Sequence, residues 1–155
     1  MVDTDLDVVL RKVQDAARLG GAGSVRALDH AVAELVARPT PAYIVALLLL
    51  LDDDADYDEA MFTLIHAAEA FDDADYIPKL LEALPAMRAK APRWASTVLM
   101  RALNSTPTRE QLVRAVRDAS RPTKDAILWL CERINERSAS LLDRTSSVSV
   151  AAQST

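Results

Sequence analysis

The sequence predicts an all-helical protein, for three reasons. Half of its residues are hydrophobic, mainly alanine, leucine and valine, whereas aromatic residues make up only 5%. Its 3 glycines all fall between positions 20 and 23, although sheet proteins need glycine at many turns. Apolar residues recur three and four positions apart, which is the spacing of one helix face. The length of 155 residues fits one domain.

Eight helices are expected, separated by prolines, glycines and capping residues. The first covers residues 3–19 and ends at the glycines, and Ser24 can cap the second, which stops before Pro39. Thr40 and Pro41 provide a cap and a first-turn proline for the third helix. This helix is apolar on more than one face, so we expect it to be buried.

Asp58, Asp75 and Pro92 mark the starts of the fourth, fifth and sixth helices. Pro78 falls in the first turn of the fifth helix, where a proline removes no intrahelical hydrogen bond. Pro85 is expected to break or kink the same helix, because it falls in the interior.

Thr108 and Gln111 have the spacing of a capping box and open the seventh helix, and Pro122 opens the eighth. Residues 145–155 are rich in serine and alanine and show no helical period. We therefore expect a single helical domain over residues 1–144, followed by a disordered tail.

The short connections predict that neighbouring helices pack antiparallel as hairpins. Pairing the third helix with the fourth, the fifth with the sixth and the seventh with the eighth gives units that begin near Pro41, Tyr76 and Arg109. This spacing is typical of solenoids of HEAT or TPR kind, and a helical bundle is the alternative.

Charge is segregated along the chain. Between Pro39 and Pro78 there is no lysine or arginine, whereas basic residues outnumber acidic ones from Lys79 onward. The acidic residues gather in two expected loops, before and after the fourth helix. The predicted partner-binding residues in these loops are Asp52, Asp53, Asp54, Asp56, Asp58, Glu59, Asp72, Asp73 and Asp75.

These acidic residues have two interpretations. In one, Asp58 and Asp75 are helix caps and the others keep a hydrophobic third helix soluble. In the other, the loops dock a basic protein, whose charge relieves their self-repulsion. The same charge argues against nucleic acid as a partner, and the basic C-terminal half has only two tryptophans, Trp94 and Trp129, which we expect in the core.

The sequence predicts no catalytic residue, metal or cofactor. A calcium-binding loop that starts at Asp52 would place Tyr57 where glycine is needed. No glycine follows Gly23 to cradle a phosphate. His66 and Glu69 lie three residues apart, but no nucleophile accompanies them, so we expect a histidine at the margin of the core.

A cytoplasmic location is expected. The single cysteine, Cys131, lies at a core-facing position and cannot form an internal disulfide, and the N-terminus lacks the layout of a secretory signal. The strongest apolar run, residues 44–51, is far shorter than the roughly 20 residues of a membrane helix, so no membrane partner is expected.

One series of segments resembles a known family. MFTLIHAAEAFD (61–72) is followed by LLEALP (80–85), APRWA (91–95) and MRALNS (100–105). Their order resembles an all-helical immunity-protein family of bacterial polymorphic toxin systems, over about residues 58–137. The resemblance implies a cytoplasmic inhibitor that binds and neutralises a cognate toxin domain in interbacterial competition, without cofactor or turnover.

The resemblance also implies a role in the fold, rather than in toxin contact, for the motif residues Leu64, His66, Glu69, Pro92, Trp94 and Asn104. Residues 1–38 and the tail fall outside it. The alternative function is a general helical-repeat adaptor that binds other proteins.

Overall fold

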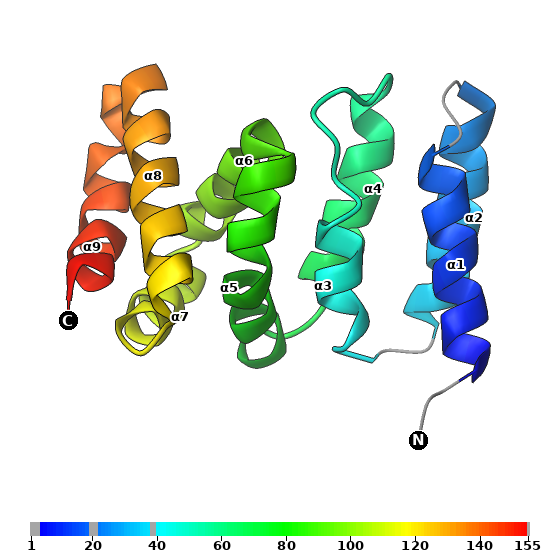
Figure 1. The fold of residues 1–155 in the computed structure, drawn as a ribbon, viewed down its shortest axis with the longest axis horizontal. Helices are drawn as coiled ribbons and strands as arrows, with labels where there is room; N and C mark the ends of the chain where they lie inside the picture. The colour runs from blue at the N-terminus through cyan, green and yellow to red at the C-terminus, as the bar shows by residue number, and fades with distance from the viewer. Residues whose placement is uncertain (1–3, 19–21, 38–39, 155) are drawn as a thin grey trace.

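The computed structural model describes residues 4–18, 22–37 and 40–154. These residues form nine α-helices and one 3₁₀-helix, which confirms the all-helical prediction. The helices stack in a row, with the two chain termini at its opposite ends (Figure 1). Their bounds are α1 Thr4–Arg18, α2 Ala22–Val36, α3 Tyr43–Leu48, α4 Asp58–Glu69, α5 Asp73–Lys90, α6 Pro92–Asn104, α7 Thr106–Arg117, α8 Arg121–Arg137, η1 Ala139–Leu141 and α9 Leu142–Gln153.

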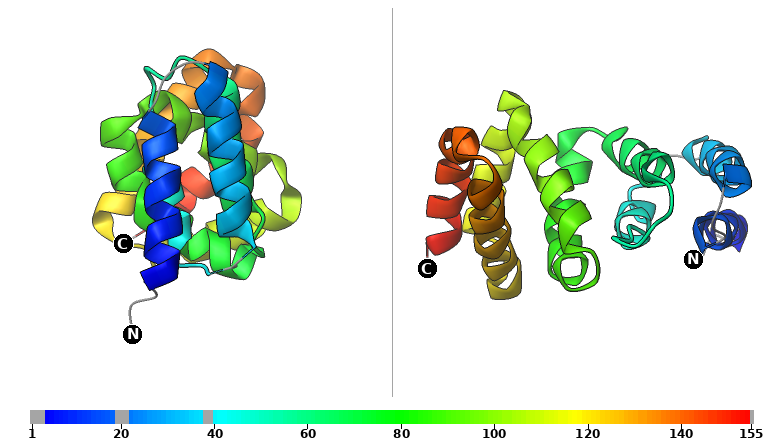
Figure 2. Two further views of the ribbon diagram at one scale, coloured as in Figure 1. Left: turned by 90° about the vertical axis from the view of Figure 1, so that its right-hand side faces the viewer. Right: turned by 90° about the horizontal axis from the view of Figure 1, so that it is seen from above.

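The first six helices form three hairpins: α1 packs against α2, α3 against α4, and α5 against α6. Contacts of α2 with α4 and of α3 with α5 join one hairpin to the next, so that the helices lie in two rows (Figure 2). The expected solenoid-like stacking is therefore confirmed, as is the pairing of the third helix with the fourth and of the fifth with the sixth.

The expected pairing of the seventh helix with the eighth is wrong. Both α7 and α8 pack against α5, α6 and α9 rather than closely against each other. The last unit of the stack therefore contains three helices, with α9 lying against both α7 and α8.

The expected disordered tail is also wrong, because residues 142–153 form α9. The buried residues of this helix are Thr145, Val148, Ala151 and Ala152. Three of these four side chains are apolar and most are small, which makes the periodic pattern weak but lets α9 approach α7 and α8 closely. The domain therefore continues past residue 144.

Pro85 does not break α5, which continues to Lys90. A proline inside a helix leaves the carbonyl oxygen four residues earlier without its N–H partner, and here that oxygen belongs to Leu81. The buried hydroxyl of Thr123, on α8, donates a hydrogen bond to Leu81 O at 2.9 Å. A neighbouring helix thus satisfies the acceptor that Pro85 leaves unpaired.

Several helices start at residues other than the expected caps. The residues that directly precede α4, α5 and α7 are Tyr57, Asp72 and Ser105. The expected caps of these helices, Asp58, Asp75 and Thr108, lie inside them, and Ser24 lies inside α2. Pro78 consequently falls in the second turn of α5, where its missing N–H leaves the carbonyl oxygen of the exposed residue Ala74 without an intrahelical partner. The expected breaks at Gly20, Gly21 and Pro39 lie outside the described residues.

One hydrophobic core runs through the stack, from Val9 in α1 to Ala152 in α9. Cys131 is buried in it, as expected, and burial raises the pKa of its thiol. The core leaves the ends of the helices, and the loops that join them, as the exposed edges of the molecule.

Candidate partner-binding surface

The predicted acidic residues lie at the two ends of α4. Residues 52–59, here called the acidic loop, comprise the segment before α4 and the first two residues of α4, at the upper edge of the molecule as drawn in Figure 1. Residues 72–75, the acidic corner, follow α4 at the lower edge. Between the two groups runs α4, whose 12 residues span about 18 Å at a rise of about 1.5 Å per residue. They form two surfaces rather than one.

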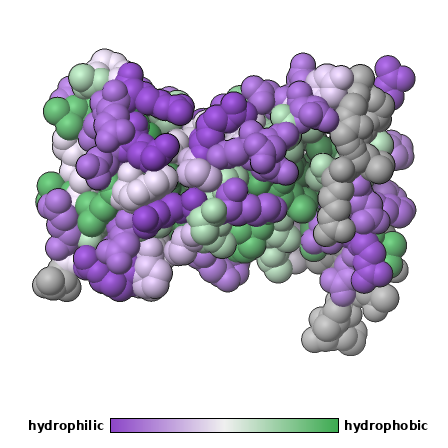
Figure 3. All heavy atoms as spheres, turned by 45° about the horizontal axis from the view of Figure 1, so that its top comes forward, coloured by the Kyte–Doolittle hydropathy of each residue, from purple (hydrophilic) through white to green (hydrophobic). Residues whose placement is uncertain are grey.

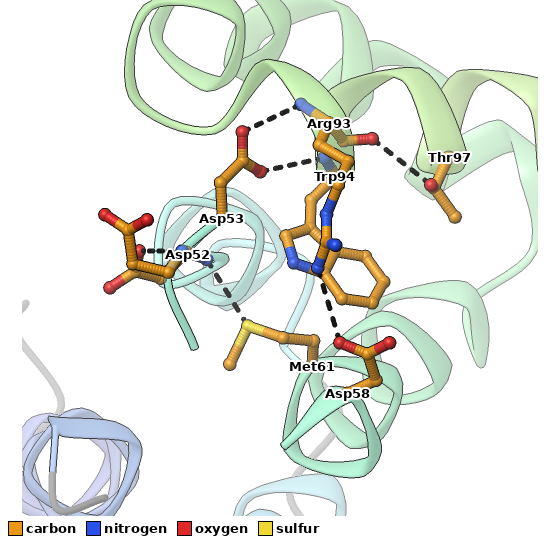
Figure 4. A network of polar contacts seen from close by, with 8 residues as sticks. Asp52, Asp53, Asp58, Met61, Arg93, Trp94 and Thr97 are labelled. Carbon is orange, nitrogen blue, oxygen red and sulfur yellow. Dashed lines mark hydrogen bonds and ion pairs between the residues drawn. The ribbon is translucent and has the colours of Figure 1, made fainter. Parts of the chain in front are cut away.

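The acidic loop is fixed to α6 by Asp53. Its carboxylate accepts hydrogen bonds from the backbone N–H of Arg93 at 3.0 Å and of Trp94 at 3.1 Å. Figure 4 shows the Asp53 side chain pointing to the start of α6. The first N–H groups of a helix have no partner within it, and Ala91, at the N-cap, has no side-chain acceptor. Asp53 therefore caps α6 from 40 residues away.

The rest of the acidic loop is ordered by short-range bonds. Asp52 Oδ1 accepts from the N–H of Asp54 at 2.9 Å, and Asp52 O accepts from the N–H of Ala55 at 3.2 Å. Asp58 pairs with Arg93 at 3.3 Å. Asp54, Asp56 and Glu59 are exposed, and none of them forms an ion pair with another described residue. Their carboxylates are thus presented by a backbone with a defined shape.

The acidic corner is used largely within the fold. Asp73 is half-buried and accepts a hydrogen bond from the Thr108 hydroxyl of α7 at 2.8 Å. Asp72 is the N-cap residue of α5, and its backbone oxygen accepts from Tyr76 at 2.9 Å. Only Asp72 and Asp75 present exposed carboxylates here.

A pocket of about 250 Å³ opens beside the acidic loop, and sequence analysis did not predict it. Three arginines line it, Arg93 of α6 with Arg133 and Arg137 of α8. Its apolar lining residues include Met100, Ile134 and Leu141, and its polar ones include Asp53, Ser96 and Thr97. The pocket could not be found from the sequence, because nothing local to Arg93 indicates that α8 lies beside it.

Trp129 is half-buried rather than in the core, so the expectation for it was wrong. The guanidinium groups of Arg88 and Arg133 lie 4.6 Å and 4.5 Å from the centre of its ring. Trp94, in contrast, is buried as expected and meets the Phe62 ring edge-on at 5.3 Å.

Figure 3, which brings the upper edge forward, shows mainly hydrophilic side chains along it.

Most of the motif residues take part in packing or pairing. Leu64 is buried in the core, and Pro92 is the first residue of α6, where its missing N–H leaves no helix bond unmade. Asn104, the last residue of α6, accepts a hydrogen bond from Arg144 of α9. Glu69 binds Arg101 of α6 through both carboxylate oxygens, with the shortest contact at 2.7 Å. These hydrogen bonds raise the pKa of Arg101.

His66 does not lie at the margin of the core as expected. It is exposed on α4, with its ring 6.1 Å from that of Phe62. Because the Glu69 carboxylate is engaged by Arg101, it does not orient His66 for proton transfer.

Residues 4–18, 22–37 and 40–154 contain no group of three or more side chains that could hold a metal ion. None of the helices in these ranges is long and apolar enough to cross a membrane.

A family model, Immunity protein 30, matches residues 15–112, from the second half of α1 into α7. The chain belongs to the immunity protein 30 family. All six motif residues fall within the immunity protein 30 match. The expected limits of the resemblance need correction, because the match begins inside the N-terminal 38 residues and ends before α8. No curated protein and no solved structure matches the chain.

Proposed function

We propose that the chain is a cytoplasmic immunity protein that binds a cognate polymorphic toxin domain, neutralises it and so protects the producing bacterium. Membership of the immunity protein 30 family carries this proposal, since the match takes in the acidic loop and most of the stack. The inhibitor acts by occupying the toxin, with no cofactor and no turnover.

The acidic loop is the proposed toxin contact. Asp54 and Asp56 are exposed on a loop whose shape is already set, and Glu59 is exposed on the first turn of α4, which lowers the entropy lost on binding. Their negative field would speed the encounter with a basic domain and penalise acidic ones. The acidic corner has fewer carboxylates available to a partner, because Asp73 accepts a hydrogen bond from the Thr108 hydroxyl.

The first test is co-expression with the C-terminal domain of the toxin encoded beside this gene. The proposal expects the chain to rescue growth and to co-purify with that domain. Absence of both effects, with the chain shown to be folded, would overturn it.

A second test concerns the acidic loop. The variant D54K/D56K/E59K should associate with the toxin domain at least about tenfold more slowly at low salt, with little change in the dissociation rate. The control E110K/E132K/E136K makes the same charge change at exposed positions on α7 and α8. If both variants associate equally slowly, net charge alone explains the effect. If D54K/D56K/E59K binds with wild-type kinetics, the acidic loop is not part of the interface.

The stacked hairpins favour a second candidate, a general helical-repeat adaptor. An adaptor requires no toxin gene beside its own. Specific binding to a peptide or complex, without rescue from any linked toxin, would favour this function over inhibition.

An enzymatic mode of protection would have to use His66, and H66Q distinguishes it from binding. Because His66 is exposed and Glu69 is held by Arg101, we expect H66Q to protect as well as wild type. A well-folded H66Q that binds the toxin but no longer protects would indicate catalysis.

A further inference from the structure

The upper edge of the stack carries two opposite chemistries side by side. The acidic loop lies at the start of α4, and the arginine-lined pocket lies between α6, α8 and η1. Asp53 and Arg93 belong to both, because Asp53 lines the pocket and Arg93 pairs with Asp58 of the loop. A partner that covers this edge therefore meets a negative and a positive region together.

We propose that the pocket receives an acidic anchor of the toxin domain, an aspartate or glutamate side chain next to an apolar one. This inference rests on the proposed function, and it adds to the acidic loop a second contact of opposite charge. The toxin face that binds here is then itself bipolar, with a basic patch beside a protruding acidic residue.

The size and lining of the pocket support a side chain as occupant. Its volume of about 250 Å³ is below the roughly 300–1,000 Å³ of small-molecule sites. Met100, Ile134 and Leu141 provide apolar contacts for the stem of the anchor. The guanidinium groups provide planar, paired N–H donors that match a carboxylate.

The net charge of the pocket is positive. Arg93 already pairs with Asp58, and the Asp53 carboxylate accepts two N–H groups of α6. Arg133 and Arg137, which also line the pocket, form no ion pair with another described residue. An anion therefore gains more in this pocket than a cation or a neutral group.

Two of the three arginines are held in place before any partner arrives. Arg133 lies over the Trp129 ring at 4.5 Å, and Arg93 lies over the Trp94 ring at 5.2 Å. Side chains that are already ordered lose less entropy on binding, so an anchor seated between them would leave slowly.

The two contacts differ in the rate that they control. Exposed charges at the rim of an interface act mainly on association, whereas buried hydrogen-bonded charges act mainly on dissociation. Arg93, Arg133 and Arg137 are exposed in the free chain, and the proposed anchor would bury them in the complex. The acidic loop should thus set the association rate of the toxin domain, and the pocket its dissociation rate.

The experiment compares the binding kinetics of wild type and R133E/R137E with the inactivated toxin domain encoded beside this gene. Loss of a buried charge pair predicts dissociation at least about 30-fold faster for R133E/R137E. The control R114E/R117E reverses two exposed arginines in the last turn of α7 and should dissociate like wild type. Ser96→Phe fills the pocket without a charge change and should also speed dissociation, which keeps the test valid if the double variant fails to fold.

Each outcome bears on the inference. A folded R133E/R137E that binds like wild type overturns the acidic anchor, while growth rescue by wild type still supports the proposed function. If wild type itself neither binds nor rescues, both proposals fall. If sedimentation shows wild-type dimers that R133E/R137E abolishes, the pocket holds a second copy of this chain, and the toxin anchor is wrong. Surface aspartates and glutamates of the toxin domain are then replaced by lysine one at a time. One of these replacements should weaken binding to wild type and restore binding to R133E/R137E.

Discussion

Replacing Asp53 by alanine tests whether the acidic loop and α6 hold each other in place. The carboxylate satisfies two N–H groups at the start of α6, those of Arg93 and Trp94. Neither the N-cap residue Ala91 nor Pro92 can take over this role, because neither side chain has a hydrogen-bond acceptor.

The magnitude follows from the cost of removing a helix cap. Replacing an N-cap acid by alanine costs about 0.5–2 kcal/mol, and a hydrogen bond to a charged group contributes about 1.5–3 kcal/mol. Asp53 is half-buried and makes two such bonds, so we expect D53A to lose about 2 kcal/mol. In a domain of this size that lowers the melting temperature by about 4–8 °C.

The assay is thermal and urea unfolding followed by circular dichroism, with D54A as the control. Asp54 is the next residue, is exposed, and loses the same charge, but its carboxylate accepts no hydrogen bond from another described residue. D54A should therefore change stability by less than about 0.5 kcal/mol. Hydrogen exchange at the amides of Arg93 and Trp94 should be faster in D53A only.

Equal stability of D53A and D54A, with unchanged exchange at the start of α6, would refute the reasoning. It would mean that the Asp53 carboxylate does not cap α6 in solution. The acidic loop would then lack its anchor, and the argument for its preformed shape would fall with it.

Three further predictions concern α9, Pro85 and the buried tyrosine. V148D buries an unpaired charge and should cost more than about 3 kcal/mol, whereas V150D, at a side chain that is 68% exposed, should cost less than about 0.5 kcal/mol; equal melting temperatures would mean that α9 does not dock. T123V leaves Leu81 O without its donor and should cost about 1–3 kcal/mol of stability. Adding P85A to T123V should recover most of this loss, because residue 85 then has an N–H for Leu81 O. Additive effects of the two substitutions in urea unfolding would contradict this prediction. Y76F removes a buried hydroxyl that has no hydrogen-bond partner among the described residues, so its stability should equal or exceed that of wild type by up to about 1 kcal/mol. Burial raises the pKa of Tyr76 above its ordinary value of 10.0. The stability of wild type is therefore retained below that pH and decreases as the pH rises above it. Urea unfolding at about pH 9 and about pH 11 should show a smaller decrease in stability for Y76F than for wild type.

The helices and their stacking could be read from the sequence because their causes are local. Apolar side chains three and four residues apart share one helix face, and short connections bring successive helices together. The hairpins α3–α4 and α5–α6 follow directly from these rules. The segregated charge is likewise a property of the sequence, and so are the motif segments that indicate the family.

Local rules failed wherever a distant part of the chain supplied the missing interaction. Pro85 stays inside α5 because Thr123 bonds Leu81 O, and α9 forms because α7 and α8 bury its small side chains. Neither effect can be seen within one turn of the residue concerned.

For the candidate surface, the sequence alone determined which residues are acidic, and that they gather around the two ends of α4. Only the tertiary structure decided that Asp53 caps α6, that Asp73 binds Thr108, and that three arginines from α6 and α8 meet in one pocket. The physical reason is range. Helix periods and caps act within about four residues, whereas hydrogen bonds and charges act on whatever the fold brings within a few ångströms, and here that partner lies 35 to 40 residues away.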